Sequence, residues 1–374
     1  MHRKSWVVLL SLASLLLAPG LFSPAGALDP VPPVNQTPPA VVGTARVGAA
    51  LTADPGTWLP EGSSYSYTWL RDGAAIAGAS GAMYRVANGD LGHRLAVRVT
   101  AHGEASGQPA TSAETAAVGK GRFASTARPT ISGVRRWGRK LTVKPGAWSP
   151  KPTSYRYQWL REDRPIPGAT KATYTLKVKD YGKHIAVRVS PRRDFYEPGA
   201  VLSFRTGPIG HRVGVRKTFT YSIATRGRIT ADLDTFAALT AQTYGDPRGW
   251  RSAGYSFRRV ARGGDFTLVL ASSSQMPSFG FPCSRTWSCR VGRNVIINQT
   301  RWLHASPAWN AQKLKLRDYR HMVVDHETGH WLGHRHRGCP GKGKKAPVMM
   351  QQSKGLGGCR FNPFPLPSER WTSR

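Results

Sequence analysis

Hydrophobic and polar residues alternate in short stretches over the first half of the chain. In HIAVRV at 184–189, Ile185, Val187 and Val189 fall on one side of an extended strand. SYRYQWL at 154–160 alternates in the same way, with its aromatic residues on one side. A half-buried strand has this period of two. Because Gly, Pro and Asp turns separate these stretches, the pattern predicts a small antiparallel β-sandwich.

The chain also repeats itself. GTWLPEGSSYSYTWLRDGAAIAGAS from Gly56 aligns without a gap with GAWSPKPTSYRYQWLREDRPIPGAT from Gly146. The alignment continues through Tyr84 over Tyr174 and Asp90 over Asp180. Self-similarity of this kind indicates two copies of one module. We expect the copies at 38–118 and 129–215, with a Pro-rich linker at 28–37 and a second linker at 119–128.

Both copies carry Y-x-Y-x-W-L-R and a later D-x-G-x-x-[LI]-A-V-R-V stretch. In these stretches they resemble the immunoglobulin-like modules that occur in tandem on bacterial surface proteins. Neither copy contains cysteine, so each core must be held by packing alone. We expect Trp69 and Trp159 in those cores, although stacking on a sugar is the alternative. The resemblance implies that the modules present another domain.

After about residue 215 the pattern becomes mixed. We expect strands in FTYSIAT from Phe219, SFRRV from Ser256, DFTLVLAS from Asp265 and NVIINQ from Asn294. A helix is predicted from Asp232 to an end at Gly245 and Pro247. Its buried side is expected to hold Leu233, Phe236, Ala237 and either Leu239 or Thr240. A second helix is predicted from about Leu316 into HETGHWLGHRH. The pattern therefore predicts one α/β or α+β domain at 216–374.

Candidate metal chemistry lies at the end of the second helix. His326 and His330 are four residues apart, so both imidazoles lie on one face and can reach the same ion. Glu327 is placed to reach a water on that ion and to act as a general base. Gly333 can adopt a positive φ, end the helix and bring His336 back as a third ligand. Three histidines with an open fourth position are typical of catalytic Zn²⁺.

The spacing H-E-x-x-H-x-x-G-x-x-H resembles the signature of the metzincin zinc endopeptidases. This resemblance implies that His326, His330 and His336 bind zinc and that Glu327 is the base. It also implies a methionine turn beneath the metal, for which APVMMQQS at 346–353 offers Met349, with Met350 as the alternative. The stretch from about 216 is also similar to an uncharacterised family of secreted bacterial proteins with this motif and a C-P-G…A-P-V-M block.

Two features depart from the metzincin pattern. Arg337 follows the third histidine, where many metzincins have an acidic residue, and no tyrosine follows Tyr319. The residue that stabilises the transition state must therefore be another one. His334 and Arg335 are candidates, and a surface histidine is the alternative interpretation of His334.

The first 27 residues have a basic start, an apolar run and an A-x-A pattern at Ala25–Ala27, which together indicate a secretory signal. An uncleaved anchor is the alternative, but the run is shorter than the roughly 20 residues of a spanning helix. We therefore expect a secreted or cell-surface protein without a membrane span. Export permits disulfides, and we expect Cys283 with Cys289 and Cys339 with Cys359, a four-cysteine zinc site being the alternative.

Lys and Arg outnumber Asp and Glu by 54 to 20, which gives a formal net charge of +34. Such a charge attracts polyanions, of which an anionic cell-wall polymer suits an exported protein, or it only keeps the chain in solution. No motif indicates specific nucleic-acid binding.

The sequence thus predicts two all-β immunoglobulin-like sandwiches followed by an α+β metzincin-like zinc domain. The function expected is that of a secreted zinc metallopeptidase. Glu327 would assist zinc-bound water in attacking a peptide or protein substrate, and the modules would display the enzyme near the cell wall. The alternative is a cell-surface or polyanion-binding protein whose zinc domain is structural or acts on a non-protein amide.

Overall fold

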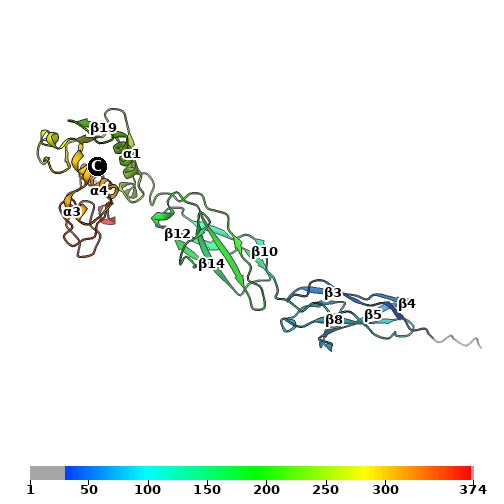
Figure 1. Ribbon diagram of the computed structural model, residues 1–374. Helices are drawn as coiled ribbons and strands as arrows, with labels where there is room; N and C mark the ends of the chain where they lie inside the picture. The colour runs from blue at the N-terminus through cyan, green and yellow to red at the C-terminus, as the bar shows by residue number, and fades with distance from the viewer. Residues whose placement is uncertain (1–29, 372–374) are drawn as a thin grey trace, which may run out of the picture. The chain divides into compact units, whose positions relative to one another are not determined.

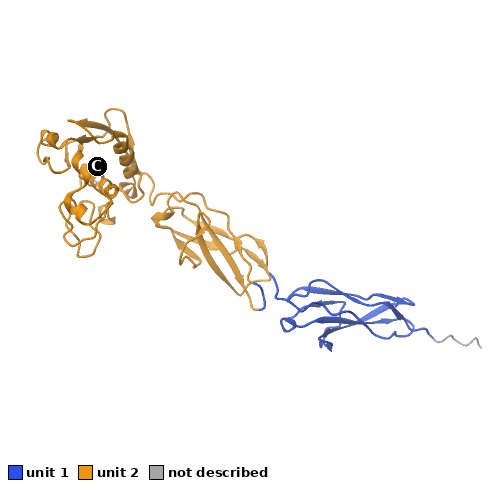
Figure 2. Ribbon diagram, viewed as in Figure 1, with its two compact units in different colours: residues 1–122, 195–197 blue, residues 123–194, 198–374 orange. Residues whose placement is uncertain are grey.

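The computed structural model describes residues 30–371. It divides into two compact units, residues 1–122 with 195–197 and residues 123–194 with 198–374 (Figure 2). The first unit holds the first module, and the second unit holds the second module and the C-terminal domain. The signal sequence expected at 1–27 lies outside the described residues.

The first module is an antiparallel β-sandwich (Figure 1). Its sheets have the orders β1-β4, β2-β3-β7 and β6-β5-β8-β9. Trp69, Leu51 and Val97 are fully buried between them. The strands are β1 (Val34–Thr37), β2 (Ala40–Val42), β3 (Ala50–Asp54), β4 (Thr57–Leu59), β5 (Ser64–Arg71), β6 (Ala74–Ala75), β7 (Met83–Arg85), β8 (Leu95–His102) and β9 (Ala110–Thr111).

The second module repeats this topology, with the sheets β10-β13, β11-β12-β16 and β15-β14-β17-β18. Trp159 is fully buried in its core, as Trp69 is in the first, so both tryptophans occupy the predicted core positions. The strands are β10 (Ala124–Ala127), β11 (Thr130–Gly133), β12 (Lys140–Lys144), β13 (Ala147–Ser149), β14 (Ser154–Arg161), β15 (Arg164–Pro165), β16 (Thr173–Thr175), β17 (Ile185–Arg192) and β18 (Val201–Leu202).

Both expected linkers are shorter than predicted. Val34–Thr37, in the range 28–37, is strand β1 and pairs with β4. Ala124–Ala127, in the range 119–128, is strand β10 and pairs with β13. Each segment forms a two-stranded edge pair, where a nearby proline is tolerated because one side of the strand needs no partner.

A buried aspartate holds each module together at the aligned positions. In the first module Asp90 is fully buried and accepts hydrogen bonds from Arg71 Nε at 2.7 Å and Tyr84 Oη at 2.7 Å. In the second, Asp180 accepts from Arg161 Nε at 2.6 Å and from Tyr174 Oη at 2.9 Å. A buried charge is stable only when it is paired and hydrogen-bonded in this way. The aspartates lie in the 3-10 turns η1 (Asn88–Asp90) and η2 (Val178–Asp180).

The C-terminal domain contains a five-stranded mixed sheet with the order β20-β19-β21-β23-β22. The first four strands are parallel, and β22 runs antiparallel at one edge. The strands are β19 (Lys217–Arg226), β20 (Tyr255–Arg259), β21 (Phe266–Ala271), β22 (Cys289–Val291) and β23 (Asn294–Asn298). The four strand segments predicted in this domain from the hydrophobic pattern are confirmed.

Four α-helices and three 3-10 turns complete this domain. They are α1 (Leu233–Gly245), α2 (Gln299–His304), α3 (Pro307–Ala311), α4 (Leu316–Trp331), η3 (Trp250–Ala253), η4 (Ser273–Phe279) and η5 (Pro367–Glu369). The two long helices, α1 and α4, match the predictions. The largest core cluster joins both of these helices to one face of the sheet, and a smaller cluster around Val269, Met276 and Ile296 covers the other face.

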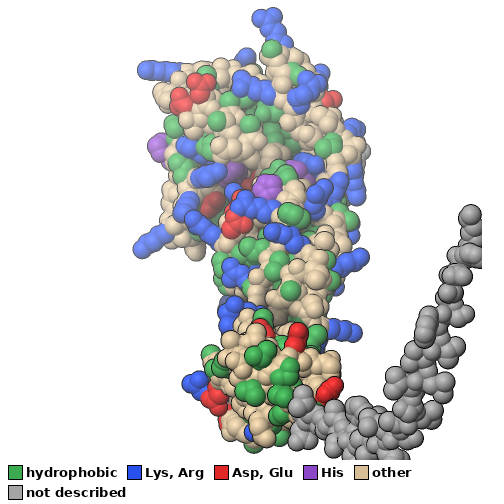
Figure 3. All heavy atoms as spheres, turned by 90° about the vertical axis from the view of Figure 1, so that its right-hand side faces the viewer, with side chains coloured by type: hydrophobic (Ala, Val, Ile, Leu, Met, Phe, Trp, Pro, Cys, Tyr) green, Lys and Arg blue, Asp and Glu red, His purple; other side chains and the backbone are tan. Residues whose placement is uncertain are grey.

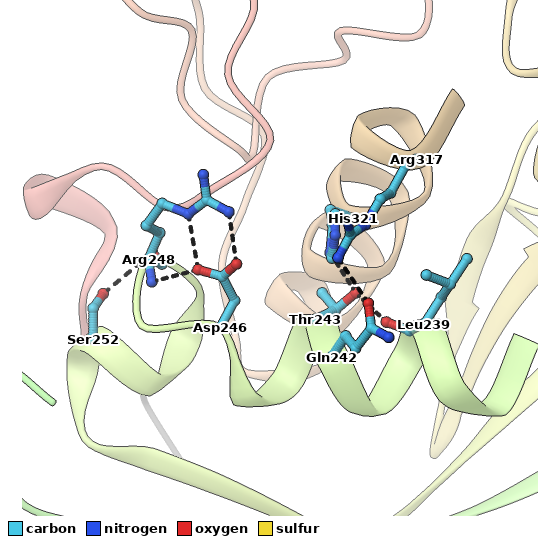
Figure 4. Close-up of polar contacts among 8 residues, drawn as sticks. All are labelled: Leu239, Gln242, Thr243, Asp246, Arg248, Ser252, Arg317 and His321. Carbon is cyan, nitrogen blue, oxygen red and sulfur yellow. Dashed lines mark hydrogen bonds and ion pairs between the residues drawn. The ribbon is translucent and has the colours of Figure 1, made fainter. Parts of the chain in front are cut away.

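Helix α1 begins at its N-cap Asp232, whose carboxylate accepts from the Thr235 amide at 2.6 Å. Its buried residues are Phe236, Thr240, Thr243 and Tyr244. The predicted burial of Leu233 is wrong, because this first residue of the helix is 45% exposed. The face of α1 that is buried is the one that packs against helix α4. His321 of α4 is hydrogen-bonded to Thr243 of α1 at 2.8 Å (Figure 4).

Two disulfides join Cys283 to Cys289 and Cys339 to Cys359. The predicted pairing is therefore confirmed, and the four-cysteine zinc site is excluded. Such bonds form and persist in oxidising compartments.

Within residues 30–371, no helix is both long and apolar enough to span a bilayer.

Candidate metal centre

Three histidine side chains converge at the C-terminal end of α4. The Nε2 atom of His336 lies 3.3 Å from Nε2 of His326 and 3.0 Å from Nε2 of His330. Three imidazoles on one tetrahedral zinc at about 2.1 Å would place these atoms about 3.4 Å apart. The side chains present therefore fit a single zinc ion. Within the described residues, this is the cluster of His, Cys, Asp or Glu that fits a metal.

The other ring nitrogens orient two of these histidines. His326 Nδ1 lies 2.7 Å from the Val348 carbonyl oxygen, and His330 Nδ1 lies 2.9 Å from the His334 carbonyl oxygen. Because a carbonyl only accepts, both Nδ1 atoms carry the hydrogen and both Nε2 lone pairs are left for a metal. Burial lowers the pKa of His326 to about 3 and that of His330 to about 4, so both rings are neutral at pH 7, which is the form that binds a metal.

Glycine at the helix end brings His336 to the other two. Gly333 has φ of +99°, its amide donates to the His330 carbonyl, and the His334 amide donates to the Gly329 carbonyl at 2.9 Å. This pair of hydrogen bonds is the Schellman motif, which reverses the chain after a helix. The predicted helix-ending role of Gly333 is confirmed.

Glu327 lies beside the histidine cluster and lines the same pocket. It is 5% exposed, and burial raises its pKa to about 8. A carboxyl group with a pKa near neutrality is suited to accept and return a proton.

Met349 packs directly under the ligand helix. It is fully buried, and its Sδ lies 2.3 Å from where a Cβ on Gly329 would stand. Gly329 occupies the turn of α4 between His326 and His330, so only a residue without a side chain permits this contact. Met350 instead belongs to a separate cluster with Ala346 and Cys359. The structure thus places Met349, the preferred residue, beneath the histidines.

Glu369 is a residue that the sequence pattern did not reveal. It is fully buried, and its carboxylate accepts hydrogen bonds from the amides of Val348 at 3.0 Å, Met349 at 2.9 Å and Leu366 at 2.7 Å. Since the Val348 carbonyl orients His326, Glu369 supports this histidine through the backbone of the methionine turn. Its position after three prolines, at the end of a Pro-rich segment, gave no signal of this contact.

His334 is buried, with 3% exposure, so its interpretation as a surface histidine is wrong. Its ring stacks on Trp250 at 4.8 Å, and its Nε2 donates to the Trp371 carbonyl at 2.6 Å. Its own carbonyl orients His330. Arg335, the other candidate, is exposed and lines the pocket.

The pocket over the histidines has a volume of about 640 Å³. Strand β22 forms part of its wall, and on its outer side no strand pairs with it among the described residues. Arg290 of β22 donates from Nη2 to the His330 carbonyl at 3.1 Å, which ties this edge to the ligand helix. The disulfide between Cys283 and Cys289 closes the loop that leads into β22. Strand β22, at the edge of the sheet, therefore borders the histidine cluster.

Residues 196–367 match the model of the family described as a protein of unknown function, DUF3152. The search among curated proteins found no match.

Two solved structures are among those similar to this chain at low identity. A two-domain fibronectin type III segment of chicken tenascin is 15% identical and covers 45% of this chain and 99% of its own, with a TM-score of 0.25. Three N-terminal domains of the highly immunogenic outer capsid protein of bacteriophage RB49 are 14% identical, cover 50% and 64%, and have a TM-score of 0.23.

Proposed function

We propose that this protein is a zinc-dependent peptidase. The observation that carries the proposal is the convergence of His326, His330 and His336 in one pocket with the buried carboxyl of Glu327. Three neutral imidazoles leave a coordination position open, which is the arrangement of catalytic rather than structural zinc sites.

In the proposed reaction, zinc would polarise a substrate carbonyl and lower the pKa of a water molecule toward 7. Glu327 accepts a proton as the water attacks, and it then donates that proton to the leaving amine. The edge of β22 offers unpaired backbone amides and carbonyls, so an extended peptide would bind there as an added strand. The chain itself thus contributes the proton transfer and the alignment of the scissile bond.

The resemblance to metzincins supports this proposal. Its expected parts, the three histidines, the glycine turn and Met349, all lie around one point in the structure. Arg337 remains the departure, since it stands where many metzincins have an acidic residue.

Two variants test the proposal. Glu327→Gln should keep bound zinc but lose cleavage of a mixed peptide library, because the amide cannot accept the proton. His330→Ala should lose both zinc and cleavage. Glu104→Gln, an exposed change in the first module, should retain both activities. Undiminished cleavage by Glu327→Gln, or stoichiometric zinc in His330→Ala, would contradict the assignment.

We further propose that the enzyme is exported and displayed near the cell wall by its modules. The two disulfides fit an oxidising compartment, and many Lys and Arg side chains are scattered over the visible face (Figure 3). A fragment of residues 28–215 should bind anionic wall polymer at low salt and be released as salt is raised. If the fragment does not bind the polymer at low salt, the modules act only as spacers. Polymer binding by this fragment without peptidase activity of 216–374 would favour a binding protein.

A further inference from the structure

The ionised side chains that line the pocket are mostly cations. Arg290, Arg335 and Lys354 line it together with a single acid, Glu327. Glu327 is already assigned to proton transfer, so no other carboxylate lines the pocket to repel an anionic substrate. The three cations come from different segments of the chain, and all of them line the pocket that contains the histidines.

Arg290 is fixed at the edge strand. Its side chain is half-buried, and Nη2 donates to the His330 carbonyl at 3.1 Å. An arginine has five N–H donors in a planar fork, so this bond leaves others for a ligand. The guanidinium is therefore held next to the place where a peptide would lie along β22.

Lys354 and Arg335 lie on the other segments that bound the pocket. Lys354 follows the methionine turn and lines the same pocket as the three histidines. Arg335 lies in the chain between His334 and His336. The side chains of these two neighbours are fixed by contacts with Trp371 and His330 respectively.

We propose that this pocket selects acidic peptides, chains that carry a carboxylate next to the bond that is cut. The inference rests on the proposed peptidase function and names its substrate class. A carboxylate in this pocket would form charge-assisted hydrogen bonds, which are stronger than neutral ones. The carboxylate belongs to an acidic side chain or to the peptide's C-terminus, and the experiment separates these two sources.

The experiment measures binding, so it does not depend on turnover. Zinc-loaded Glu327→Gln, as the full chain, is titrated into three fluorescent peptides of equal length at physiological ionic strength. The first has acidic side chains and an amidated C-terminus. The second has Asn and Gln in their place and a free C-terminus. The third has Asn and Gln and an amidated C-terminus, so it carries no carboxylate.

We expect the first or the second peptide to bind about tenfold tighter than the third. The double charge reversal Arg335→Glu/Lys354→Glu should remove this preference. The matched control Arg262→Glu/Lys144→Glu changes the net charge equally at exposed positions outside the pocket, and it should keep the preference. Preference for the first peptide identifies a side-chain carboxylate, and preference for the second identifies the chain terminus.

Equal affinity for all three peptides would overturn the inference. So would an equal loss of preference in the control, since the whole basic surface would then be responsible. The two proposals also fail separately. Selective binding without cleavage by the wild type would refute the peptidase, and cleavage of all three peptides at one rate with equal affinities would refute only the selectivity.

Discussion

At the scale of single residues, the close contact between helix α4 and the methionine turn leaves no room for a side chain at Gly329. A Cβ on Gly329 would lie 2.3 Å from Met349 Sδ and 2.8 Å from Trp250 Cζ2. Both partners are fully buried, so neither has free space into which it can move. The absence of a side chain at this position lets the methionine approach the ligand helix.

We expect Gly329→Ala to lower the free energy of unfolding of the C-terminal domain by about 1–3 kcal/mol, because it overpacks this contact. Zinc affinity should fall with it, as the ligand helix shifts. Gly245→Ala, at the end of α1 with open space around its Cβ, is the control and should be neutral or slightly stabilising. Denaturant unfolding and zinc titration measure both effects. Wild-type stability and zinc affinity in Gly329→Ala would contradict the packing described.

Glu369 gives a second prediction at this scale. Replacing it with glutamine leaves one acceptor oxygen and turns an NH2 group toward backbone amides that need an acceptor. We expect a loss of about 2–3 kcal/mol in the free energy of unfolding and weaker zinc binding. Glu61→Gln, an exposed change, should alter stability by less than about 0.5 kcal/mol. If zinc binding is unchanged in a destabilised Glu369→Gln, the carboxylate supports the fold but not the ligand.

The contrast between His326 and Glu369 shows why parts of the site could be predicted. The spacing of His326 and His330 becomes a spatial relation through helix geometry alone. Glu369 reaches amides about 20 residues away through irregular backbone, which no local pattern encodes. Burial of His334 likewise depends on stacking against Trp250, a tertiary contact.

At the scale of elements, the packing of α1 against α4 depends on polar contacts as well as on apolar area. His321 is buried and hydrogen-bonded to Thr243, and Arg317 donates to Gln242 at 2.8 Å (Figure 4). Burial lowers the pKa of His321, with charged neighbours acting in both directions. These neighbours are Asp246 and Asp318, which raise it, and Arg317 and Arg248, which lower it.

The sign of the pH effect follows from this shift. In the unfolded chain His321 takes up a proton near its ordinary pKa of 6.5, whereas in the folded domain it does so only at lower pH. The unfolded state therefore binds more protons as pH falls below about 6.5, and the domain loses stability in that range. Unfolding measured from pH 7.5 to 5 should show a shallower loss in His321→Gln than in the wild type. The exposed His304→Gln should keep the wild-type slope, and equal slopes in all three would contradict the assignment.

The strength of the hydrophobic pattern decided which elements could be predicted. Strands β21 and β23 have apolar runs that are buried in the sheet, and β19 buries Phe219 and Tyr221 at alternating positions; all three strands were predicted. Helices α2 and α3 have only six and five residues, too few for a periodic face. The buried face of α1 was predicted in part: Phe236 and Thr240 are buried, whereas Leu233 is exposed and the buried Thr243 was not predicted.

At the scale of the whole molecule, the proposed metal belongs to one domain only. Zinc should raise the unfolding temperature of the C-terminal domain and leave the transitions of the modules in place. At a thousandfold excess of free zinc over Kd, the stabilisation is about 4 kcal/mol. Calorimetry of the full chain with zinc or with chelator measures this, and His330→Ala should show no response. A zinc shift of the module transitions would contradict a single site.

The buried aspartates of the modules have a consequence for how such a chain can change in length. Asp90 and Asp180 each find their arginine and tyrosine within the same copy, so neither network depends on the other module. A duplicated module of this kind therefore contains the complete hydrogen-bond network that its buried aspartate needs. Genes that gain or lose a copy can therefore add or remove a whole module without changing the domain that follows.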